Sequence, residues 1–285
     1  MTIVVTGATG KVGGYLVNRL QQTGAEYVAA SRTPKGTRAR KFDWNDTSTW
    51  DALLTDATRL WIVPQAEGVY DVSATIEKFV HRALERSAIE QIGLLSVRNA
   101  EQLNKDLPSL KLEHMLAGLE IPWFSLRPTW FYQNFAYGMF ARGIQEHRKL
   151  LAPTQDGAVS FIDADDIAAC AQSALTSIPA VTGIHELSGP SSLTFAELAQ
   201  TLTSVLGRTI EHADVDDEEM TVYLQGNGLV SAHIAALINH FARIRDGGSG
   251  AVEPGVQLLL GRPALSFADY LAREPEAVAA LSTRS

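Results

Sequence analysis

Short apolar runs alternate with segments of helical periodicity through the first 130 residues. The apolar runs are typical of strands buried on both faces, and they cover residues 2–6, 26–31, 59–63, 92–96 and 123–127, with a further strand between 39 and 44. Residues 11–22, 48–54, 72–86 and 111–118 carry apolar positions three and four apart, which predicts helices with one buried face. Strands that alternate with helices indicate βαβ units. The pattern therefore predicts an α/β fold with a doubly wound parallel sheet.

The second half of the chain is less regular. Helices are predicted over 135–146, 163–175, 194–206 and 266–273, and strands over 158–162 and 184–187. Thr194 and Glu197 have the spacing of a capping box, and residues 246–250 (DGGSG) read as a flexible loop. We expect a large domain of residues 1–130, to which 158–188 return. Residues 131–157 and 189–285 are then expected to form a smaller lobe over the carboxyl edge of the sheet, where ligands bind in such folds.

Composition and charge narrow the class of partner. The chain has 285 residues, 46% of them hydrophobic and 20% charged, with a net charge of −8. An acidic surface repels phosphate backbones, so we expect no nucleic-acid partner. The single cysteine excludes an intrachain disulfide and a cysteine-based zinc site, and no metal site is predicted.

The chain also lacks the signals of membrane attachment or export. No apolar run approaches the roughly 18–20 residues that span a bilayer, so no membrane partner is expected. Because the first predicted strand begins almost at Met1, no room is left for a signal peptide, and we expect a cytoplasmic protein.

One glycine-rich turn carries the first chemical signal. It joins the first strand to the first helix and consists of Gly7, Ala8, Thr9, Gly10, Lys11, Val12 and Gly13. Gly7 permits a sharp turn, Gly10 lets backbone N–H groups approach a pyrophosphate, and Gly13 lets the helix lie close to the sheet. The helix N-terminus adds N–H donors and partial positive charge. The turn predicts dinucleotide binding, which makes residues 1–130 a nucleotide-binding domain of the Rossmann type.

The end of the second strand distinguishes NAD from NADP. NAD enzymes usually place an acid there to bind the ribose 2′-hydroxyl, whereas this chain has Ser31, Arg32 and Lys35 and no acid between them. Arg32 can hold a 2′-phosphate with two hydrogen bonds while Ser31 donates a third. The alternative is a solvated arginine. We expect NADP(H) as the cofactor.

Two further strand ends are candidates for cofactor contacts. Asp43 and Trp44 end the third strand, where the carboxylate either accepts from the adenine amino group or forms an Asx turn or helix cap. Val63, Pro64 and Gln65 end the fourth strand, beside the expected nicotinamide ribose.

Longer segments resemble a known family. They are residues 126–134 (LRPTWFYQN), 161–168 (FIDADDIA), 185–190 (HELSGP) with 193–197 (LTFAE), and the final 260–263 (LGRP) and 266–270 (SFADY). Together with the glycine turn they resemble the NmrA-like atypical short-chain dehydrogenases, a family that includes quinone, azo-dye and imine or enone reductases and NADP-sensing regulators. The resemblance implies that the loop after the Arg-Pro strand lies against the nicotinamide. It assigns Phe131, Tyr132, Gln133 and Asn134 to the cofactor site.

The chain departs from the typical short-chain pattern in its proton donors. Typical members use Tyr-x-x-x-Lys, in which lysine lowers the pKa of the tyrosine. The residues four positions after the seven tyrosines are Arg19, Ser31, Ala74, Ala136, Ala141, Asn227 and Glu274. Many relatives also carry a lysine where this chain has Ser109. We therefore expect no dedicated acid, and the catalytic residues are unknown.

Weak catalytic candidates remain. Ser96 ends the fifth strand, where a serine can orient a carbonyl, and Tyr132 could supply a proton. His114 is more often a surface or packed residue in such a helix, and Asp163, Asp165 and Asp166 are expected to cap a helix rather than bind metal. We expect Ser96, Trp130, Phe131 and Phe135 to line a site for a flat or aromatic substrate.

The sequence is consistent with two main functions. The first is an NADPH-dependent reductase that transfers hydride to an electron-poor small molecule of the quinone, enone or imine type, for which positioning suffices. The second is an NADP(H)-binding redox sensor without turnover, which the absent Tyr-x-x-x-Lys favours. An isomerase or cyclase on the same fold is a weaker third reading. The oligomeric state, whether monomer or homodimer, does not follow from the sequence.

Overall fold

The computed structural model describes residues 1–64, 71–103 and 105–282. The chain divides into two compact units, each made of several segments. Unit 1 comprises 1–128, 164–187 and 255–262, and unit 2 comprises 129–163, 188–254 and 263–285. The predicted division differs by one or two residues at the 128/129 and 187/188 boundaries and more widely in two places. Residues 158–163 lie in unit 2, because their strand pairs there with β10 (Leu193–Thr194), and residues 255–262 lie in unit 1, because their helix packs on α7 (Ala164–Thr176).

Unit 1 is built on a seven-stranded sheet with the order β3-β2-β1-β4-β5-β6-β9. Its strands are β1 (Thr2–Val5), β2 (Glu26–Ser31), β3 (Ala39–Lys41), β4 (Arg59–Ile62), β5 (Gln91–Leu95), β6 (Trp123–Pro128) and β9 (Gly183–Leu187). Every neighbouring pair is parallel; in β1, Ile3 pairs with Tyr27 on one side and Arg59 on the other. The predicted doubly wound parallel sheet is confirmed. The strand order reverses between β1 and β4, which is where ligands bind in this fold.

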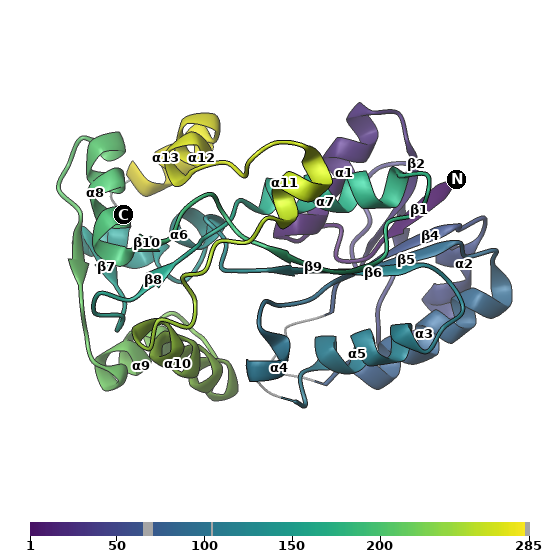
Figure 1. The fold of residues 1–285 in the computed structure, drawn as a ribbon, viewed down its shortest axis with the longest axis horizontal. Coiled ribbons are helices and arrows are strands. Elements are labelled where there is room, and N and C mark those ends of the chain that lie inside the picture. Colours follow the sequence, from purple (N-terminus) through teal and green to yellow (C-terminus); the bar gives the residue numbers. More distant parts are fainter. Residues whose placement is uncertain (65–70, 104, 283–285) are drawn as a thin grey trace. The chain divides into compact units, whose positions relative to one another are not determined.

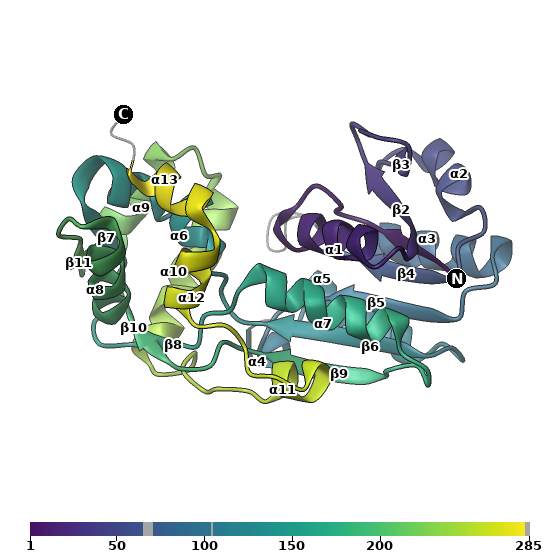
Figure 2. The same cartoon turned by 90° about the horizontal axis from the view of Figure 1, so that it is seen from above.

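Helices cover both faces of this sheet. They are α1 (Lys11–Gln22), α2 (Trp50–Leu54) after the 3₁₀ turn η1 (Thr47–Thr49), α3 (Ser73–Arg86), α4 (Ala100–Leu103), α5 (Pro108–Ala117), α7 (Ala164–Thr176) and α11 (Gly255–Leu260). Figure 1 shows α1 and α7 on one face and α3 and α5 on the other. Figure 2 shows α1 and α7 running side by side, and the two helices are in extensive contact. The apolar strands are therefore buried on both sides, as the sequence predicts.

The lone cysteine lies in α7 with its side chain fully buried. Burial raises the pKa of the Cys170 thiol to about 12, and the Asp166 carboxylate contributes. Thiolate is the reactive form, so we expect native protein to resist alkylation by iodoacetamide at pH 8. The rate should be about 10³-fold below that of the same protein unfolded in guanidinium, measured by mass spectrometry. Equal rates in the two states would contradict the burial of this thiol.

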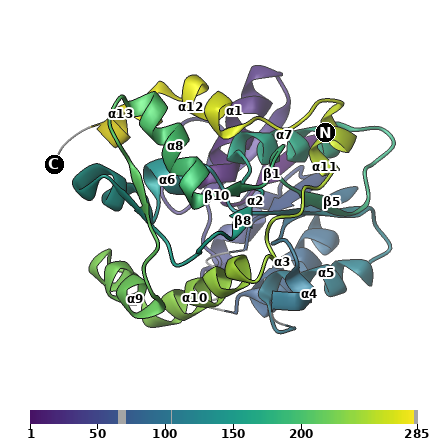
Figure 3. The same ribbon diagram turned by 60° about the vertical axis from the view of Figure 1, so that its left-hand side comes forward.

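Unit 2 combines small sheets with helices. Its elements are α6 (Gln133–Tyr137), the π-helical turn η2 (Gly143–His147), β7 (Lys149–Leu151), β8 (Ala158–Val159), β10 (Leu193–Thr194), α8 (Phe195–Leu206), β11 (Glu211–Ala213), α9 (Asp217–Gly226), α10 (Ser231–Arg245), α12 (Phe267–Arg273) and α13 (Pro275–Ser282). β8 pairs with β10 in antiparallel fashion, and β7 pairs with β11 in parallel. α9 and α10 pack against one another (Figure 3). The predicted capping box of Thr194 and Glu197 is confirmed at the start of α8.

The core of unit 2 is aromatic. Phe135 is fully buried, with its ring centroid 5.1 Å from Phe140, 5.2 Å from Phe161 and 5.1 Å from Phe267. Such offset and edge-to-face contacts add to the burial of apolar area. Phe135 and Phe267 are 132 residues apart in sequence, so these ring contacts hold separate segments of unit 2 together.

The helix predicted over 135–146 is wrong. α6 ends at Tyr137, and Gly138 takes an extended backbone conformation with φ −128°. A Cβ at Gly138 would lie 2.8 Å from the Cα of Asn134, so the chain turns there at a point that only glycine tolerates. α9 and α10 are helices that were not predicted from the sequence.

No helix in the described ranges 1–64, 71–103 and 105–282 is both long and apolar enough to cross a lipid bilayer.

Candidate functional site: a dinucleotide cradle at the carboxyl edge of the sheet

The carboxyl edge of the parallel sheet brings most of the predicted site residues together. Gly7 follows β1, Arg32 follows β2, Val63 follows β4 and Ser96 follows β5. Because all of these strands are parallel, their carboxyl ends meet at one edge of unit 1. Residues that are far apart in sequence thus form one continuous rim.

The glycine turn at this rim has little room for side chains. Gly7 has φ +62°, in the left-handed region that glycine favours. A Cβ at Gly13 would lie 2.2 Å from the carbonyl oxygen of Gly7, so α1 can approach the turn this closely only through a glycine. Gly10 differs: its Cβ would lie 3.2 Å from the same oxygen, which is tight but not blocked. Gly7 and Gly13 are therefore required for the backbone conformation of the turn. Gly10 has no side chain that would cover the outer side of the turn.

The N-terminus of α1 is suited to an anion. Its cap residue, Gly10, makes no side-chain capping hydrogen bond, and the first turn of this fully described helix carries no acidic residue. Ala8 and Val12 are buried and anchor the loop, whereas Thr9 and Lys11 are exposed at the rim. The first-turn N–H groups and the helix dipole favour negative charge, as in phosphate-binding turns.

The end of β4 supports the turn from behind. The Val63 N–H donates to Thr6 Oγ1 at 2.8 Å, and that hydroxyl donates to the Trp61 carbonyl at 3.1 Å. A Cβ at Gly7 would lie 2.9 Å from the Cβ of Val63, so the valine side chain rests directly on the glycine. Pro64 follows and is half-buried, while the predicted Gln65 lies outside the described residues. Val63 thus fixes the shape of the cradle.

The residue directly after β2 is Arg32, and its guanidinium has no binding partner among the described residues. Arg32 is exposed and makes no hydrogen bond or ion pair with any described residue, and the same holds for Lys35. Arg38 differs, because it pairs with Glu26 at 3.1 Å and lies over the Tyr27 ring. Ser31 Oγ accepts a hydrogen bond from the Thr33 N–H at 3.2 Å. Arg32 is therefore available to an anionic ligand.

Asp43 and Trp44 are largely occupied by structural contacts. Asp43 Oδ1 accepts from the Asn45 N–H at 2.9 Å, which is the Asx turn given as the alternative above. The Trp44 ring is buried, 4.6 Å from Phe42 and 5.3 Å from Phe79 between ring centroids. A cofactor contact from Trp44 would have to come from its backbone.

Residues 130–135 lie in unit 2, and two of their predicted roles need correction. Tyr132 is fully buried among aromatic rings, and its hydroxyl donates to the Leu265 carbonyl at 3.4 Å, so it is not placed to act as an acid on a substrate. Phe135 lies in the core and does not line a surface. Both side chains are buried because they pack in the aromatic core of unit 2.

The other residues of this segment have mixed environments. Gln133 is buried and donates to Asp163 Oδ1 at 2.8 Å, while Arg273 donates to Asp163 Oδ2 at 2.7 Å. The Gln133 amide therefore stabilises the fold of unit 2 and is not directed at a ligand. Phe131, Asn134 and Trp130 are only partly buried, so their roles stay predictions.

A buried arginine sits near the end of β6. The Arg127 and Glu113 side chains are only 5% and 2% exposed, and Arg127 Nε donates to Glu113 Oε1 at 2.9 Å. Arg127 also pairs with Glu101 at 2.7 Å and Glu186 at 3.3 Å, and Ser125 donates to Glu113 at 2.6 Å. Burial alone would lower the pKa of Arg127, but the hydrogen bonds to Glu113 and Glu101 outweigh it and raise the pKa above its ordinary value. In the sequence, Arg127 stands out only as part of the family motif 126–134.

Solved structures share this fold. QOR2, an NADPH-dependent quinone oxidoreductase of Escherichia coli solved with NADPH, superposes with a TM-score of 0.81 at 23% identity, over 96% of this chain and 99% of that chain. NmrA, a negative transcriptional regulator solved with NAD, gives a TM-score of 0.72 at 15% identity, over 99% and 98%. The model of the NAD dependent epimerase/dehydratase family matches residues 3–88. At these identities the two structures establish the shared fold.

A curated relative decides the family. Agroclavine dehydrogenase of Claviceps fusiformis is 30% identical over 284 residues, which cover 95% of this chain and 96% of the relative. The chain belongs to the NmrA-like atypical short-chain dehydrogenases. The predicted family is confirmed, and the protein is an NAD(P)H-dependent oxidoreductase with a nicotinamide dinucleotide as its cofactor.

This NmrA-like dehydrogenase offers one unpartnered hydroxyl at the rim. Ser96 is buried, and its Oγ makes no hydrogen bond with any residue the structure describes. A buried hydroxyl without a partner is costly, so a ligand that supplies one would be favoured there. His114, in contrast, is exposed on α5, in line with a surface role.

The acidic residues of the family motif 161–168 are paired with arginines. Asp165 accepts from Arg19 at 2.5 and 2.6 Å, and Asp166 accepts from Arg262 at 2.7 Å. Both also lie in the first turn of α7, where they favour the helix dipole as predicted. Within the described residues, no group of three or more histidine, cysteine, aspartate or glutamate side chains could hold a metal ion.

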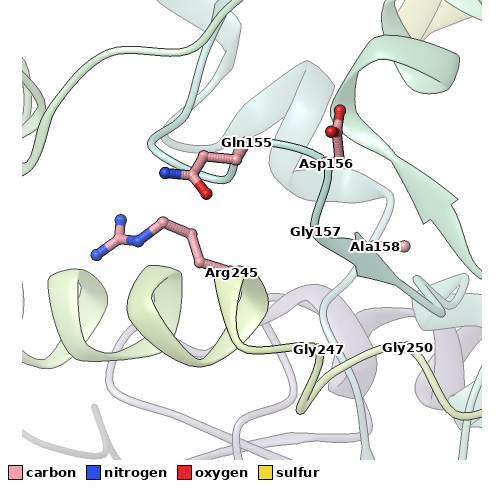
Figure 4. A pocket seen from close by; sticks show the side chains of 7 residues that line it. All are labelled: Gln155, Asp156, Gly157, Ala158, Arg245, Gly247 and Gly250. Carbon is pink, nitrogen blue, oxygen red and sulfur yellow. The ribbon is translucent and has the colours of Figure 1, made fainter.

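A separate cavity of about 390 Å³ lies in unit 2 of this dehydrogenase. Gln155, Asp156 and Arg245 contribute its polar side chains, and Figure 4 shows Arg245 reaching toward Gln155 while Asp156 points away. Arg245 is already bound to Asp217 at 2.8 and 3.0 Å and to the Pro153 carbonyl at 2.6 Å. Its guanidinium therefore serves the structure of unit 2, and we assign the cavity no role in catalysis.

Proposed function

We propose that this protein is an NADPH-dependent reductase that transfers hydride to an electron-poor small molecule. The observation that carries the cofactor choice is Arg32, which is exposed directly after β2 and has no partner among the described residues. An acid at this place would repel a 2′-phosphate, and none is present between Ser31 and Lys35.

The residues at the rim fit a bound dinucleotide. Gly10 leaves the outer side of the turn open, the uncapped N-terminus of α1 suits a pyrophosphate, and the Ser96 hydroxyl lacks a partner among the described residues. When bound, the reduced nicotinamide supplies a hydride. The protein binds and orients the dinucleotide through Arg32, the glycine turn and the rim of β4.

The substrate class is proposed from two lines of support. Trp130 and Phe131 are partly buried aromatic residues and suit a flat acceptor. The relative and the solved neighbour carry the names of an agroclavine dehydrogenase and a quinone oxidoreductase. An electron-poor acceptor delocalises the incoming electron pair, so it depends less on a dedicated acid. We therefore propose a quinone, enone or imine type of acceptor.

Replacing Arg32 by alanine should weaken NADPH binding selectively. We expect a loss of about 1.5–3 kcal/mol, the contribution of charge-assisted hydrogen bonds to the phosphate, with NADH affinity nearly unchanged. Calorimetric titration of both cofactors measures the difference. Arg40→Ala is the matched control, because Arg40 is equally exposed but bonds to the Thr37 carbonyl at 2.9 Å. Equal losses for NADPH and NADH, or a parent protein that prefers NADH, would refute the assignment.

The alternative is a redox sensor that binds NADP(H) without turnover, which the absent Tyr-x-x-x-Lys pattern supports. NADPH oxidation measured at 340 nm against a panel of quinones, enones and imines separates the two functions. The reductase predicts turnover with at least one class of acceptor. Tight NADPH binding with no oxidation by any of them would favour the sensor.

A further inference from the structure

We propose that the ion pair between Arg127 and Glu101 positions the rim segment, residues 96–101, and thereby sets the affinity of the cradle for the nicotinamide half of the cofactor. The rim segment begins where β5 ends and runs into α4. Both partners of the ion pair and the whole rim segment belong to unit 1. The inference rests on the proposed function, because it takes the orientation of the dinucleotide from Arg32.

The strand order gives the direction in which a bound dinucleotide would extend. Arg32 follows β2, on one side of β1, and the glycine turn follows β1 itself. With the 2′-phosphate at Arg32 and the pyrophosphate at the turn, the nicotinamide half would extend to the other side, over β4 toward β5. Neighbouring strands are about 4.8 Å apart, so β5 lies roughly 10 Å from β1 across the sheet. A ribose that carries a nicotinamide ring is long enough to reach the end of β5.

Ser96, the first residue of the rim segment, carries a polar group that this half can bind. Ser96 is only 6% exposed, and its Oγ has no hydrogen-bond partner among the residues that the structure describes. Its backbone is fixed, since the Ser96 N–H donates to the Leu126 carbonyl of β6 at 2.8 Å. A carboxamide has both donors and an acceptor, so the nicotinamide can supply the partner of the hydroxyl.

Two further contacts tie the rim segment to β6. The Arg98 N–H donates to the Pro128 carbonyl at 3.1 Å. Asn99 has φ +56°, and its carbonyl accepts from two N–H groups of α4 at 3.0 Å, so the chain turns there into α4, which packs on α5 (Figure 1). Glu101 lies after this turn and meets Arg127, whose Nη1 and Nη2 donate to the two carboxylate oxygens at 2.9 and 2.7 Å. Such a bidentate contact fixes geometry as well as charge.

The two partners of this ion pair differ in how firmly they are held. The Arg127 side chain is 5% exposed and is anchored by the buried Glu113, whereas the Glu101 side chain is 52% exposed. The hydrogen bond from Arg127 lowers the pKa of Glu101, so the carboxylate is charged and the pair is intact at neutral pH. If Glu101 is removed, Glu113 and Glu186 still compensate the Arg127 charge. Loss of Glu101 therefore releases the rim segment without leaving a buried charge unpaired.

The experiment compares the binding of NADPH and of adenosine 2′,5′-bisphosphate by calorimetry in the parent and in Glu101→Ala. The bisphosphate carries the 2′-phosphate and the adenosine but no nicotinamide, so it probes only the part of the cradle at Arg32 and the glycine turn. We expect Glu101→Ala to bind NADPH about tenfold more weakly and the bisphosphate unchanged, because a residue that touches no ligand typically alters affinity by this order. Glu101→Gln keeps an oxygen that accepts from Arg127 and should fall between Glu101→Ala and the parent.

A matched control and a second measurement accompany the titrations. Glu85→Gln removes the same charge from α3, where the Glu85 side chain is 69% exposed and pairs with Arg82 at 3.8 Å, and it should leave both affinities unchanged. Hydrogen exchange followed by mass spectrometry should show faster exchange of residues 96–101 in Glu101→Ala and unchanged exchange of α1. The melting temperature of Glu101→Ala should stay close to that of the parent.

Three results would overturn the proposal: unchanged NADPH affinity in Glu101→Ala, an equal loss of affinity for NADPH and the bisphosphate, and unchanged exchange of residues 96–101. If the parent prefers NADH to NADPH, the proposed cofactor choice fails, and a comparison of NADH with ADP still tests the ion pair. There, a loss in Glu101→Ala that is confined to NADH supports the positioning role, whereas an equal loss or no loss refutes it. A parent that binds neither dinucleotide refutes both proposals.

Discussion

Gly10→Val is expected to abolish NADPH binding while the protein still folds. The backbone at Gly10 has φ −82° and ψ 176°, an extended conformation that valine adopts readily, and its Cβ would meet only the Gly7 oxygen at 3.2 Å. The two γ-methyl groups would then fill the space in front of the first-turn N–H groups, where we propose that a pyrophosphate binds. We expect NADPH affinity to fall by at least about 100-fold, or roughly 2.7 kcal/mol.

Two neighbouring glycines give this experiment its controls. Gly14→Ala should keep cofactor affinity and raise stability by about 0.5–1 kcal/mol, because its Cβ would lie 3.8 Å from the nearest atom within a helix. Gly13→Ala should lose both folding stability and binding, because its Cβ would lie 2.2 Å from a carbonyl oxygen. Fluorescence titration with NADPH and thermal unfolding separate the three cases. Unchanged NADPH affinity in Gly10→Val would contradict the assigned phosphate site.

Arg127→Met is expected to produce the largest loss of stability of any single ion-pair substitution considered. It leaves the Glu113 carboxylate, which is 2% exposed, without its cation. Removal of one partner of a buried pair typically costs about 3–5 kcal/mol, mostly because the remaining charge is no longer compensated. Urea unfolding followed through tryptophan fluorescence measures the change.

An exposed pair and a double substitution test this explanation. Arg82 pairs with Asp51 at 2.8 Å, with both side chains about 40% exposed, so Arg82→Met should cost no more than about 1 kcal/mol. Adding Glu113→Leu to Arg127→Met removes the unpaired charge and should recover part of the loss. A double variant that is no more stable than Arg127→Met would show that the charge is not the cause.

The parts of the fold set by local chemistry were predictable from the sequence. The glycine turn, the buried strands and the cap at Thr194 depend on residues within a few positions of one another, and all three are present. The break at Gly138 was missed although it is local, since the contact that requires glycine is with Asn134, four residues earlier, and glycine inside a helix is unfavourable. α10 could have been found, since Ile234, Leu237, Phe241 and Ile244 repeat at helical spacing.

The residues of the candidate site also differ in whether local sequence or long-range contacts determine their environment. Arg32 was identifiable because its role depends on its position after a strand and on the charges beside it. Tyr132 was misjudged because its partners, Phe267 and Tyr270, lie more than 130 residues away and no local pattern reveals them. The Arg127 pairs to Glu113 and Glu186 join different elements of unit 1, so they emerge only from the folded chain.

The division of the chain has a consequence for how this protein can diversify. The backbone passes from one unit to the other five times, at 128/129, 163/164, 187/188, 254/255 and 262/263. Neither unit is encoded by a continuous stretch of gene, so recombination at one or two crossover points cannot exchange a whole unit for that of another family member. Exchange of a whole unit would instead need crossovers at several of these boundaries at once. Laboratory evolution of this scaffold is accordingly better served by site-directed libraries than by shuffling of fragments.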